Sequence, residues 1–528
     1  MIKKIIQVIK QKTNKEIFII ILLLILLSPL YFFNLSSIPT SIHGDEAETA
    51  LQALEIIKNN TGLIGIGSSM LMPLLSFIPH AIFIVLFGEN IFSDRLAAVF
   101  FGVLTLPILY FLIKDLFNKR LALITTILLG TSHLWIALSR IGLQNTQATF
   151  FIVLELLILM KALRSGKKLD FLLSGGVFGL SMYSYVGVRI LIFMVIALYI
   201  NYFYKRVQIK QKLLNLILFL FSAALVFLPQ AIFYLNNNSS LLIRENDVFV
   251  FSKIAKEWAN YTKMNNVQIL FEQTKHTFNI FRGDNSTQYG YKGQLLNYFS
   301  IIFFLIGICY GISKIKYFKY QFLFFWLFLA ILGQILFTMP PPIFLPRFAV
   351  GLPIMYFFIA IGIFKISENI AKLTKNLKYF YLVIVLFIAY SISWNFYVYF
   401  IDYPKQIAGD PNARTTTKIG YYLNSLNNDY VAYFDTMPTI WADYRLIRFI
   451  SPTGYKIDIA DSNLNNLIKN QNKINDIRAL SKIKDVAFII YPEYGNSLKI
   501  LKNIFPDGHI LTFKEINNSI QFYVFRLK

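Results

Sequence analysis

Two adjacent carboxylates, Asp45 and Glu46, stand directly after the first strongly apolar segment of the chain. Ionised side chains are costly beside a bilayer, so a carboxylate pair at this boundary favours a functional use. The residues that follow, 47–54, are good helix formers, which predicts that the pair begins a helix. A carboxylate held there can act as a general base toward an acceptor hydroxyl. We therefore predict Asp45 as the catalytic base and Glu46 as its support.

A structural interpretation of the same residues stays open. An N-cap or an ion pair with an arginine would explain one acidic residue, but explains less well two that follow His43. His43 and His80 are single loop histidines, which are more often hydrogen-bonding residues than metal ligands. We assign no metal ligand, leave a divalent cofactor undecided, and place His43 among the substrate-binding candidates.

The composition indicates a membrane protein. Of the 528 residues 56% are hydrophobic and 15% are charged, whereas soluble domains are about one quarter charged. The net charge of +23 comes from basic runs between apolar segments, which we attribute to topology and to contact with anionic lipids, not nucleic acid. The single Cys309 provides no disulfide framework and no thiolate metal site.

Eleven segments reach the roughly 20 mostly apolar residues that a spanning helix needs. They are 17–33, 93–113, 121–138, 147–163, 169–186, 188–204, 213–234, 296–313, 321–338, 346–364 and 379–399. Every second connection is rich in Lys and Arg, which assigns these connections to the cytoplasm. We therefore predict a multi-pass protein of the plasma or inner membrane, with a cytoplasmic N-terminus and an extracytoplasmic tail.

Residues 70–87 are also apolar enough to span. A span there would turn every later loop over and place five basic runs outside. Pro73, Pro79 and His80 further argue against a regular span. We therefore predict an interfacial or re-entrant helix.

The predicted fold is an all-α membrane bundle over residues 1–400, with a small α/β domain over 401–528. The bundle carries two exofacial loops, 34–92 and 235–295. Apolar residues at helical spacing from 267 to 281 predict either an amphipathic helix on the membrane or a packed loop helix. In the tail, the pattern predicts strands at 429–434 and 485–491, a hairpin of 509–516 with 520–527, and helices at 412–426 and 462–470.

Three arginines lie at the outer ends of the spans, against the positive-inside rule. Arg347 is the first candidate for an exofacial anion site, followed by Arg189 and Arg140. A guanidinium is a forked donor that matches phosphate or carboxylate. The alternatives are snorkelling to lipid headgroups and ion pairs with acidic residues. Glu155, within the fourth span, should face the bundle interior with a structural partner.

The order of these motifs resembles the GT-C glycosyltransferases of the protein O-mannosyltransferase and aminoarabinose-transferase superfamily (glycosyltransferase family 39-like). The resemblance covers about residues 17–400. It rests on Asp45-Glu46-Ala47, the proline-containing apolar segment, 87–96, Ser139-Arg140, 179–185 with Arg189, 281–284, and Pro346-Arg347 with 351–353. The loop 141–145 departs from the family pattern because it carries no acidic residue, which puts a metal held between two loops in doubt.

The resemblance implies inverting transfer of a sugar from a polyprenyl-phosphate carrier to an exofacial protein, lipid or glycan. Asp45 and Glu46 would serve catalysis, and Arg347, Arg189, Arg140, His43, Arg282 and Asp284 would bind substrate. The alternatives are a lipid-linked sugar flippase or exporter and an envelope polysaccharide polymerase or ligase. A transporter should carry polar residues at mid-bilayer in broken helices. Here the polar residues gather at the outer face, which favours an enzyme.

Overall fold

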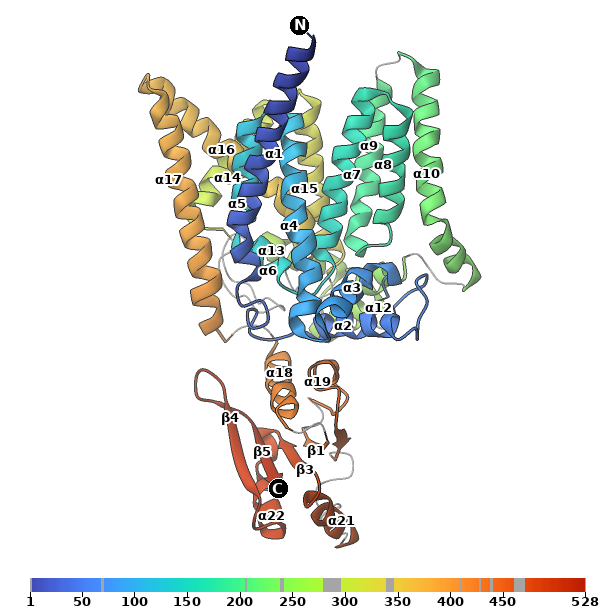
Figure 1. Ribbon diagram of the computed structural model, residues 1–528, viewed down its shortest axis with the longest axis vertical. Coiled ribbons are helices and arrows are strands. Elements are labelled where there is room, and N and C mark those ends of the chain that lie inside the picture. Colours follow the sequence, from blue (N-terminus) through green and yellow to red (C-terminus); the bar gives the residue numbers. More distant parts are fainter. Residues whose placement is uncertain are drawn as a thin grey trace.

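The computed structural model describes residues 2–67, 71–204, 207–237, 242–278, 296–338, 346–407, 410–426, 429–436, 440–459 and 471–527. A helical bundle forms one end of the molecule and an α/β domain forms the other, with the N-terminus at the far end of the bundle (Figure 1). The predicted fold class is confirmed.

Each of the eleven predicted spans coincides with a helix or a pair of helices. They are α1 (Ile2–Phe32), α4 (Ile91–Leu116), α5 (Lys119–Gly130) with α6 (His133–Ser139), α7 (Asn145–Ser165), α8 (Lys168–Ser181), α9 (Ile190–Tyr204), α10 (Ile209–Asn236), α14 (Tyr298–Ser313), α15 (Phe318–Leu336), α16 (Leu352–Leu373) and α17 (Leu377–Phe396). Eight helices in the described part of the chain are long and apolar enough to cross a membrane, or nine if α5 and α6, bent by 62°, form one span. The helices α8 and α14 are shorter than a full crossing requires.

The segment 70–87 does not form a span. Leu74–Phe77 is a 3₁₀ turn (η1), and α3 (Ile78–Phe87) has ten residues, about 15 Å of helix against a hydrocarbon core of about 30 Å. The helix α3 packs on α4 and on α2 (Gly44–Ile57) at the end of the bundle that faces the α/β domain (Figure 1). Its outer side chains, Val85 and Leu86 among them, are exposed, as expected of an interfacial helix.

The loop after α10 forms three helices, α11 (Ile243–Val248), α12 (Lys253–Thr262) and α13 (Asn266–Phe278). In α13 the buried side chains are Ile269, Gln273 and Thr277, while Val267 and Phe271 are exposed. Gln273 donates a hydrogen bond to the carbonyl oxygen of residue 338, just after α15, at 2.9 Å. The buried side of α13 thus carries two polar residues beside Ile269, and apolar Val267 and Phe271 lie among its exposed residues, where they can contact lipid.

Glycines allow two pairs of helices to approach closely. A Cβ on Gly175 of α8 would lie 2.1 Å from the carbonyl oxygen of Phe219 in α10. A Cβ on Gly307 of α14 would lie 1.9 Å from that of Phe358 in α16. Small residues at such contacts are typical of membrane helices. Between α7 and α8, the Ser174 hydroxyl donates to the Glu155 carboxylate at 2.6 Å, which confirms the interior position and structural partner predicted for Glu155.

The tail forms a sheet in the order β2-β1-β3-β5-β4, with β1, β2 and β3 parallel and β5 antiparallel to both β3 and β4. Its elements are α18 (Pro411–Asn424), β1 (Tyr430–Asp435), α19 (Arg445–Ile450), β2 (Tyr455–Asp458), α21 (Gln471–Ser481), β3 (Asp485–Ile490), α22 (Asn496–Ile504), β4 (His509–Lys514) and β5 (Ile520–Leu527). The two predicted strands, the hairpin and the first helix are confirmed. The helix expected at 462–470 lies outside the described residues.

Adjacent glycines of α8 provide a test of the close packing. Gly175→Ala should lower the thermal unfolding temperature by several degrees, because overpacking a tight contact costs about 1–3 kcal/mol. Gly176→Ala is the matched control, since its Cβ would meet only Ser222 Oγ, at 3.4 Å. Equal unfolding temperatures for the two variants in detergent would contradict the predicted α8–α10 contact.

Candidate functional site

Asp45 lies in the first turn of α2, whose N-cap is His43. The His43 Nδ1 atom accepts a hydrogen bond from the Asp45 backbone N–H at 3.1 Å, so the proton of the neutral ring is on Nε2. The Asp45 side chain is 29% exposed, and its Oδ2 lies 3.7 Å from His43 Nδ1. The N-cap considered from the sequence is therefore present, but His43 provides it. The Asp45 carboxylate remains partly exposed.

Glu46, the next residue, faces the opposite way and is buried. Its Oε1 accepts from Arg95 Nε at 2.6 Å and from the Gly142 backbone N–H at 3.0 Å, and its Oε2 accepts from Arg95 Nη2 at 3.3 Å. Arg95 is also fully buried, and its Nη1 group donates hydrogen bonds to the carbonyl oxygens of Leu35 and Pro39. Glu46 thus joins α2 to α4 and to the loop before α7.

Asp94, the neighbour of Arg95, joins α4 to α3 instead. His80 Nδ1 lies 2.7 Å from Asp94 Oδ1, and both side chains are buried. A Cβ on Gly142 would lie 1.8 Å from Asp94 Oδ2 and 3.1 Å from Glu46 Cγ. A glycine is therefore required where the loop before α7 crosses both carboxylates. The first turn of α4 therefore fixes α2, which carries Asp45, and also α3.

Arg140 lies apart from the other predicted arginines. It is fully buried, and its guanidinium donates to the carbonyl oxygens of Leu30, Phe33 and Ile38 at the end of α1. Its Cζ also lies 5.4 Å from the centre of the Phe400 ring. These four bonds and the burial of the side chain indicate a structural role for Arg140.

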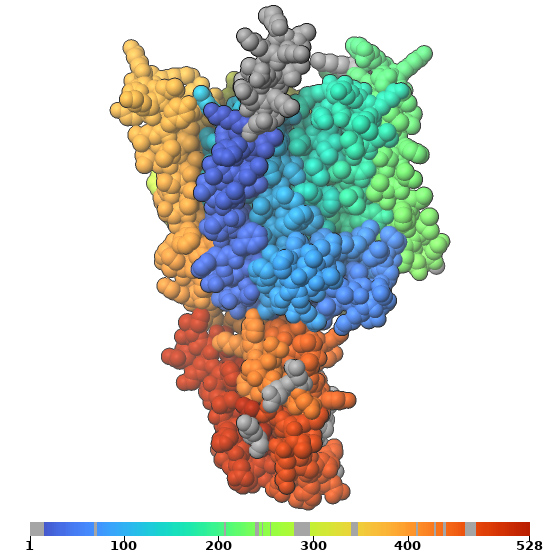
Figure 2. Space-filling model, in the orientation of Figure 1, coloured from blue at the N-terminus to red at the C-terminus, as the bar shows by residue number. Residues whose placement is uncertain are grey.

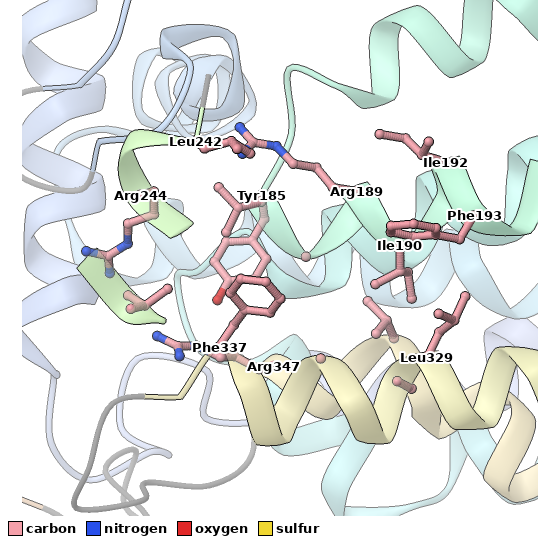
Figure 3. Close-up of a pocket in the computed structure, with 16 residues that line it drawn as sticks. Tyr185, Arg189, Ile190, Ile192, Phe193, Leu242, Arg244, Leu329, Phe337 and Arg347 are labelled. Atoms are coloured by element: carbon pink, nitrogen blue, oxygen red, sulfur yellow. The ribbon is translucent and has the colours of Figure 1, made fainter. Parts of the chain in front are cut away.

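Arg189 and Arg347 line one cavity of about 310 Å³, together with Arg244. They come from three elements: η2 (Val186–Arg189), η4 (Pro346–Gly351) and α11. In Figure 3 the guanidinium groups of Arg244 and Arg347 lie toward one end of the cavity, and Phe193 and Leu329 lie toward the other. Within the described residues, Arg347 Nη1 is buried without a hydrogen-bond partner. The cavity therefore combines cationic and apolar walls.

Arg244 was not predicted from the sequence. A signal was available, because Arg244 is another arginine in the predicted exofacial loop 235–295. Arg282 and Asp284 lie outside the described residues. The structure thus brings together two of the predicted arginines and adds a third.

A short chain of contacts links Asp45 to the elements around the cavity, although Asp45 is not among the lining residues. The Thr49 hydroxyl donates to the Asp45 carbonyl oxygen at 2.9 Å. The side-chain amide of Gln144 donates to Thr49 Oγ1 at 3.4 Å. Gln144 precedes α7, which contacts η4 and therefore the element of Arg347. A substrate that reaches both must extend along this end of the bundle.

The α/β domain also reaches Asp45. The helix α19 packs on α2 through Leu446 and Phe449, in one cluster with Ala47 and Ala50. Arg445 Nη1 lies 4.0 Å from Asp45 Oδ1, and its Nε lies 3.7 Å from Glu48 Oε2. Figure 2 shows the domain against the blue segments of the bundle that include α2. No local pattern links a residue at position 445 to one at position 45, so this contact could not be predicted from the sequence.

Tyr444 lies at the same junction. Burial, followed by the negative charge of Asp410, raises the pKa of its phenol above the ordinary value; the charge of Asp45 acts in the same direction and that of Arg445 opposes it. The phenol is therefore protonated at neutral pH. In the described part of the chain no three His, Cys, Asp or Glu side chains group as metal ligands. At the N-terminal end of α2, His43 Nδ1 and Asp45 Oδ2 lie 3.7 Å apart.

The two carboxylates should differ in their effect on stability. Glu46→Gln should lower the free energy of unfolding by about 3–5 kcal/mol, because it leaves Arg95 as an uncompensated buried charge. Asp45→Asn, the matched change one residue earlier, should leave it nearly unchanged because that side chain is partly exposed. Thermal unfolding of both purified variants measures this, and an equal loss in both would refute the assignment.

A comparison with curated protein sequences found no match. Residues 72–233 match the family described as dolichyl-phosphate-mannose-protein mannosyltransferase. This region contains α3 to α10, and with them Asp94, Arg95, Arg140 and Arg189.

Solved structures match almost the whole chain. ArnT from Cupriavidus metallidurans bound to undecaprenyl phosphate matches at 12% identity and a TM-score of 0.52, over 98% of both chains. The oligosaccharyltransferase of Archaeoglobus fulgidus in the apo form matches at 12% identity and a TM-score of 0.53, over 96% of this chain and 74% of that one. The same enzyme tethered with an acceptor peptide containing the NVT sequon matches at 13% identity and a TM-score of 0.50, over 96% and 73%.

The resemblance inferred from the motifs is thus confirmed at two levels. The family match covers the first part of the bundle, and the fold match extends through the α/β domain. The apolar helices make the chain a multi-pass membrane protein. The chain therefore has the fold of ArnT and of the archaeal oligosaccharyltransferase, and its residues 72–233 carry the match to the mannosyltransferase family.

Proposed function

We propose that the chain transfers a sugar from a polyprenyl-phosphate carrier to an exofacial acceptor, with Asp45 as the base. The observation that carries the proposal is the cavity lined by Arg189, Arg244 and Arg347. Its cationic end and apolar end suit an amphiphile whose head is a phosphate and whose tail is a hydrocarbon. ArnT, which shares the fold, has been crystallised with undecaprenyl phosphate, and this supports a carrier of the same class here.

The cavity is suited to the head of the carrier and the first part of its tail. It lies between α9 and α15, and Ile192 and Phe193 of its apolar wall also face outward. A tail that starts in the cavity can therefore leave between these helices into the hydrocarbon. Arg347 contributes a buried Nη1 donor without a partner in the described structure, and a charged donor of this kind is costly to bury unless an anion binds it.

The reaction has a simple balance. Asp45 accepts the proton of an acceptor hydroxyl, whose oxygen forms a bond to the anomeric carbon from the side opposite the phosphate. The bond between that carbon and the phosphate oxygen breaks, and the carrier phosphate leaves with the electron pair. The phosphate gains negative charge in this step, so preorganised guanidinium groups stabilise the transition state. Holding donor and acceptor at one membrane level also removes much of the entropy cost of their encounter.

The acceptor would approach from the side of the α/β domain. Asp45 is exposed there between α2 and Arg445, whereas Glu46 is closed off behind it. We place this face outside the cell with the N-terminus in the cytoplasm, as the basic runs predict, and we take residues 1–400 as the transferase domain and 401–528 as its extracytoplasmic cover. An envelope polysaccharide polymerase or ligase would use the same donor. Only the identity of the acceptor separates that alternative from the transferase proposed here.

Replacing the base should abolish transfer without removing the fold. Asp45→Asn keeps the size of the side chain but loses the basic lone pair, so transfer should fall by at least about a hundredfold. The measurement is transfer from a radiolabelled polyprenyl-phosphate sugar by the purified protein, with the labelled product identified as protein, lipid or glycan. Glu55→Gln, on the same helix and bonded to Asn60, is the control and should stay active. Near-normal transfer by Asp45→Asn would remove Asp45 from the mechanism.

The arginines should govern donor binding separately from catalysis. Arg347→Ala should weaken the affinity for the polyprenyl-phosphate sugar roughly tenfold to a hundredfold, the range expected for a lost charge-assisted hydrogen bond. Arg347→Lys keeps the charge but loses the fork, so its loss should be smaller. Arg244→Ala should resemble Arg347→Ala.

The affinity is measured in nanodiscs without acceptor. Asp45→Asn should bind the donor normally, and Arg164→Ala, whose side chain pairs with Asp115 away from the cavity, is the matched control. If both Arg347→Ala and Arg244→Ala bind the donor with wild-type affinity, the cavity does not bind the carrier phosphate.

A further inference from the structure

A second basic site lies at the opposite end of the bundle, near the turn between α16 and α17 and on the side of the N-terminus (Figure 1). Two cavities of about 180 and 380 Å³ adjoin there and share Phe364 in their walls. They lie between the ends of α5, α14, α15, α16 and α17. We call the two together the basic groove. Its position excludes it from the sugar-transfer site.

The first cavity holds two half-buried lysines above aromatic rings. Lys319 Nζ lies 4.4 Å from the centre of the Phe117 ring, and Lys365 Nζ lies 4.7 Å from the centre of the Tyr310 ring. Cation–π contacts of this kind fix the direction of a flexible ammonium group. Lysines that only mark topology extend into water, whereas these two are held against the walls of a cavity.

The second cavity adds Arg120, Lys372 and Lys375. The Cζ of Arg120 lies 5.7 Å from the centre of the Phe380 ring. Among the lining residues of both cavities, one carboxylate, Glu368, faces five basic side chains. It pairs with Lys365 at 2.6 Å and with Lys372 at 3.4 Å. No described carboxylate lies within 4.0 Å of Lys319, Arg120 or Lys375, so the groove has an excess of positive charge.

The surface beside the groove indicates which kind of anion the groove suits. Leu373, Leu377 and Leu382 are exposed next to the second cavity, on the last turn of α16 and the first turns of α17. A soluble anion would leave these apolar side chains unused. A phospholipid would fill both regions, with its phosphate in the groove and its acyl chains along α17. Basic pockets between membrane helices are known to hold anionic headgroups.

We propose that the basic groove binds the headgroup of an anionic phospholipid from the leaflet on the N-terminal side of the membrane. The proposal is independent of the sugar-transfer reaction. Bound there, the lipid bridges α5, α15, α16 and α17, and α16 is the helix that follows η4 and its Arg347. The lipid would therefore stabilise the bundle from the end opposite to the cavity that faces the donor.

The test uses the full-length protein in nanodiscs of phosphatidylcholine, with or without phosphatidylglycerol. Lipid that remains bound after transfer to detergent is quantified by native mass spectrometry, and thermal unfolding is followed in parallel. The site variant is Arg120→Gln with Lys319→Gln. The matched control is Lys167→Gln with Lys168→Gln, which removes the same charge from the α7–α8 connection, outside the groove. The wild-type protein and the control variant should retain phosphatidylglycerol. The site variant should retain at most about one tenth of the wild-type amount.

Three outcomes would overturn the proposal. The site variant could retain as much phosphatidylglycerol as wild type, or the control could lose as much as the site variant, which would reduce the effect to general surface charge. Inorganic phosphate could also raise the unfolding temperature in phosphatidylcholine nanodiscs as far as phosphatidylglycerol does, which would assign the groove to a soluble anion. Donor transfer by the site variant, measured alongside, confirms that it is folded.

Discussion

The buried ion pair between Glu46 and Arg95 is the interaction on which the catalytic end of the protein depends. Removing two charges from water costs several kcal/mol per ion unless the remaining donors and acceptors are satisfied. Here the pair is bidentate, and the Gly142 N–H and three backbone carbonyl groups complete it. One pair therefore fixes α2, α4, the end of α1 and the loop before α7 in a single arrangement, and Asp45 is one residue away from it.

Charge and hydropathy predicted the helices well because the bilayer imposes the constraint: a span must be long, apolar and internally hydrogen-bonded. The same reasoning overestimated α8 and α14, which have 14 and 16 residues. Hydropathy continues across residues 182–186, but the backbone turns there and then enters η2. Where a helix ends is decided by tertiary contacts that an apolar stretch does not encode.

The arginines show how far the site itself could be predicted. Arg140, Arg189 and Arg347 are all exceptions to the positive-inside rule. Arg140 nevertheless donates to carbonyl groups at the end of α1, whereas Arg189 and Arg347 line a cavity. Their neighbours in sequence do not distinguish them, because the partners of Arg140 lie about a hundred residues earlier in the chain. Arg445 was missed for the same reason. Sequence reasoning identified the type of residue, and only the fold decides which of them meet.

The ion pairs of Glu46 and Asp45 differ in strength, and the difference suits their positions. The pair of Arg445 with Asp45 is 4.0 Å long, and the Arg445 side chain is 44% exposed, so it contributes about 0–1 kcal/mol. An acceptor can replace it at little energetic cost, whereas nothing that enters the site can replace the buried pair of Glu46 with Arg95. One face of α2 is therefore fixed to the bundle, and the other packs on α19 with only a weak ion pair beside Asp45. Under the proposed function, an acceptor hydroxyl that approaches Asp45 has only this weak pair to displace, while the buried pair keeps the helix in place.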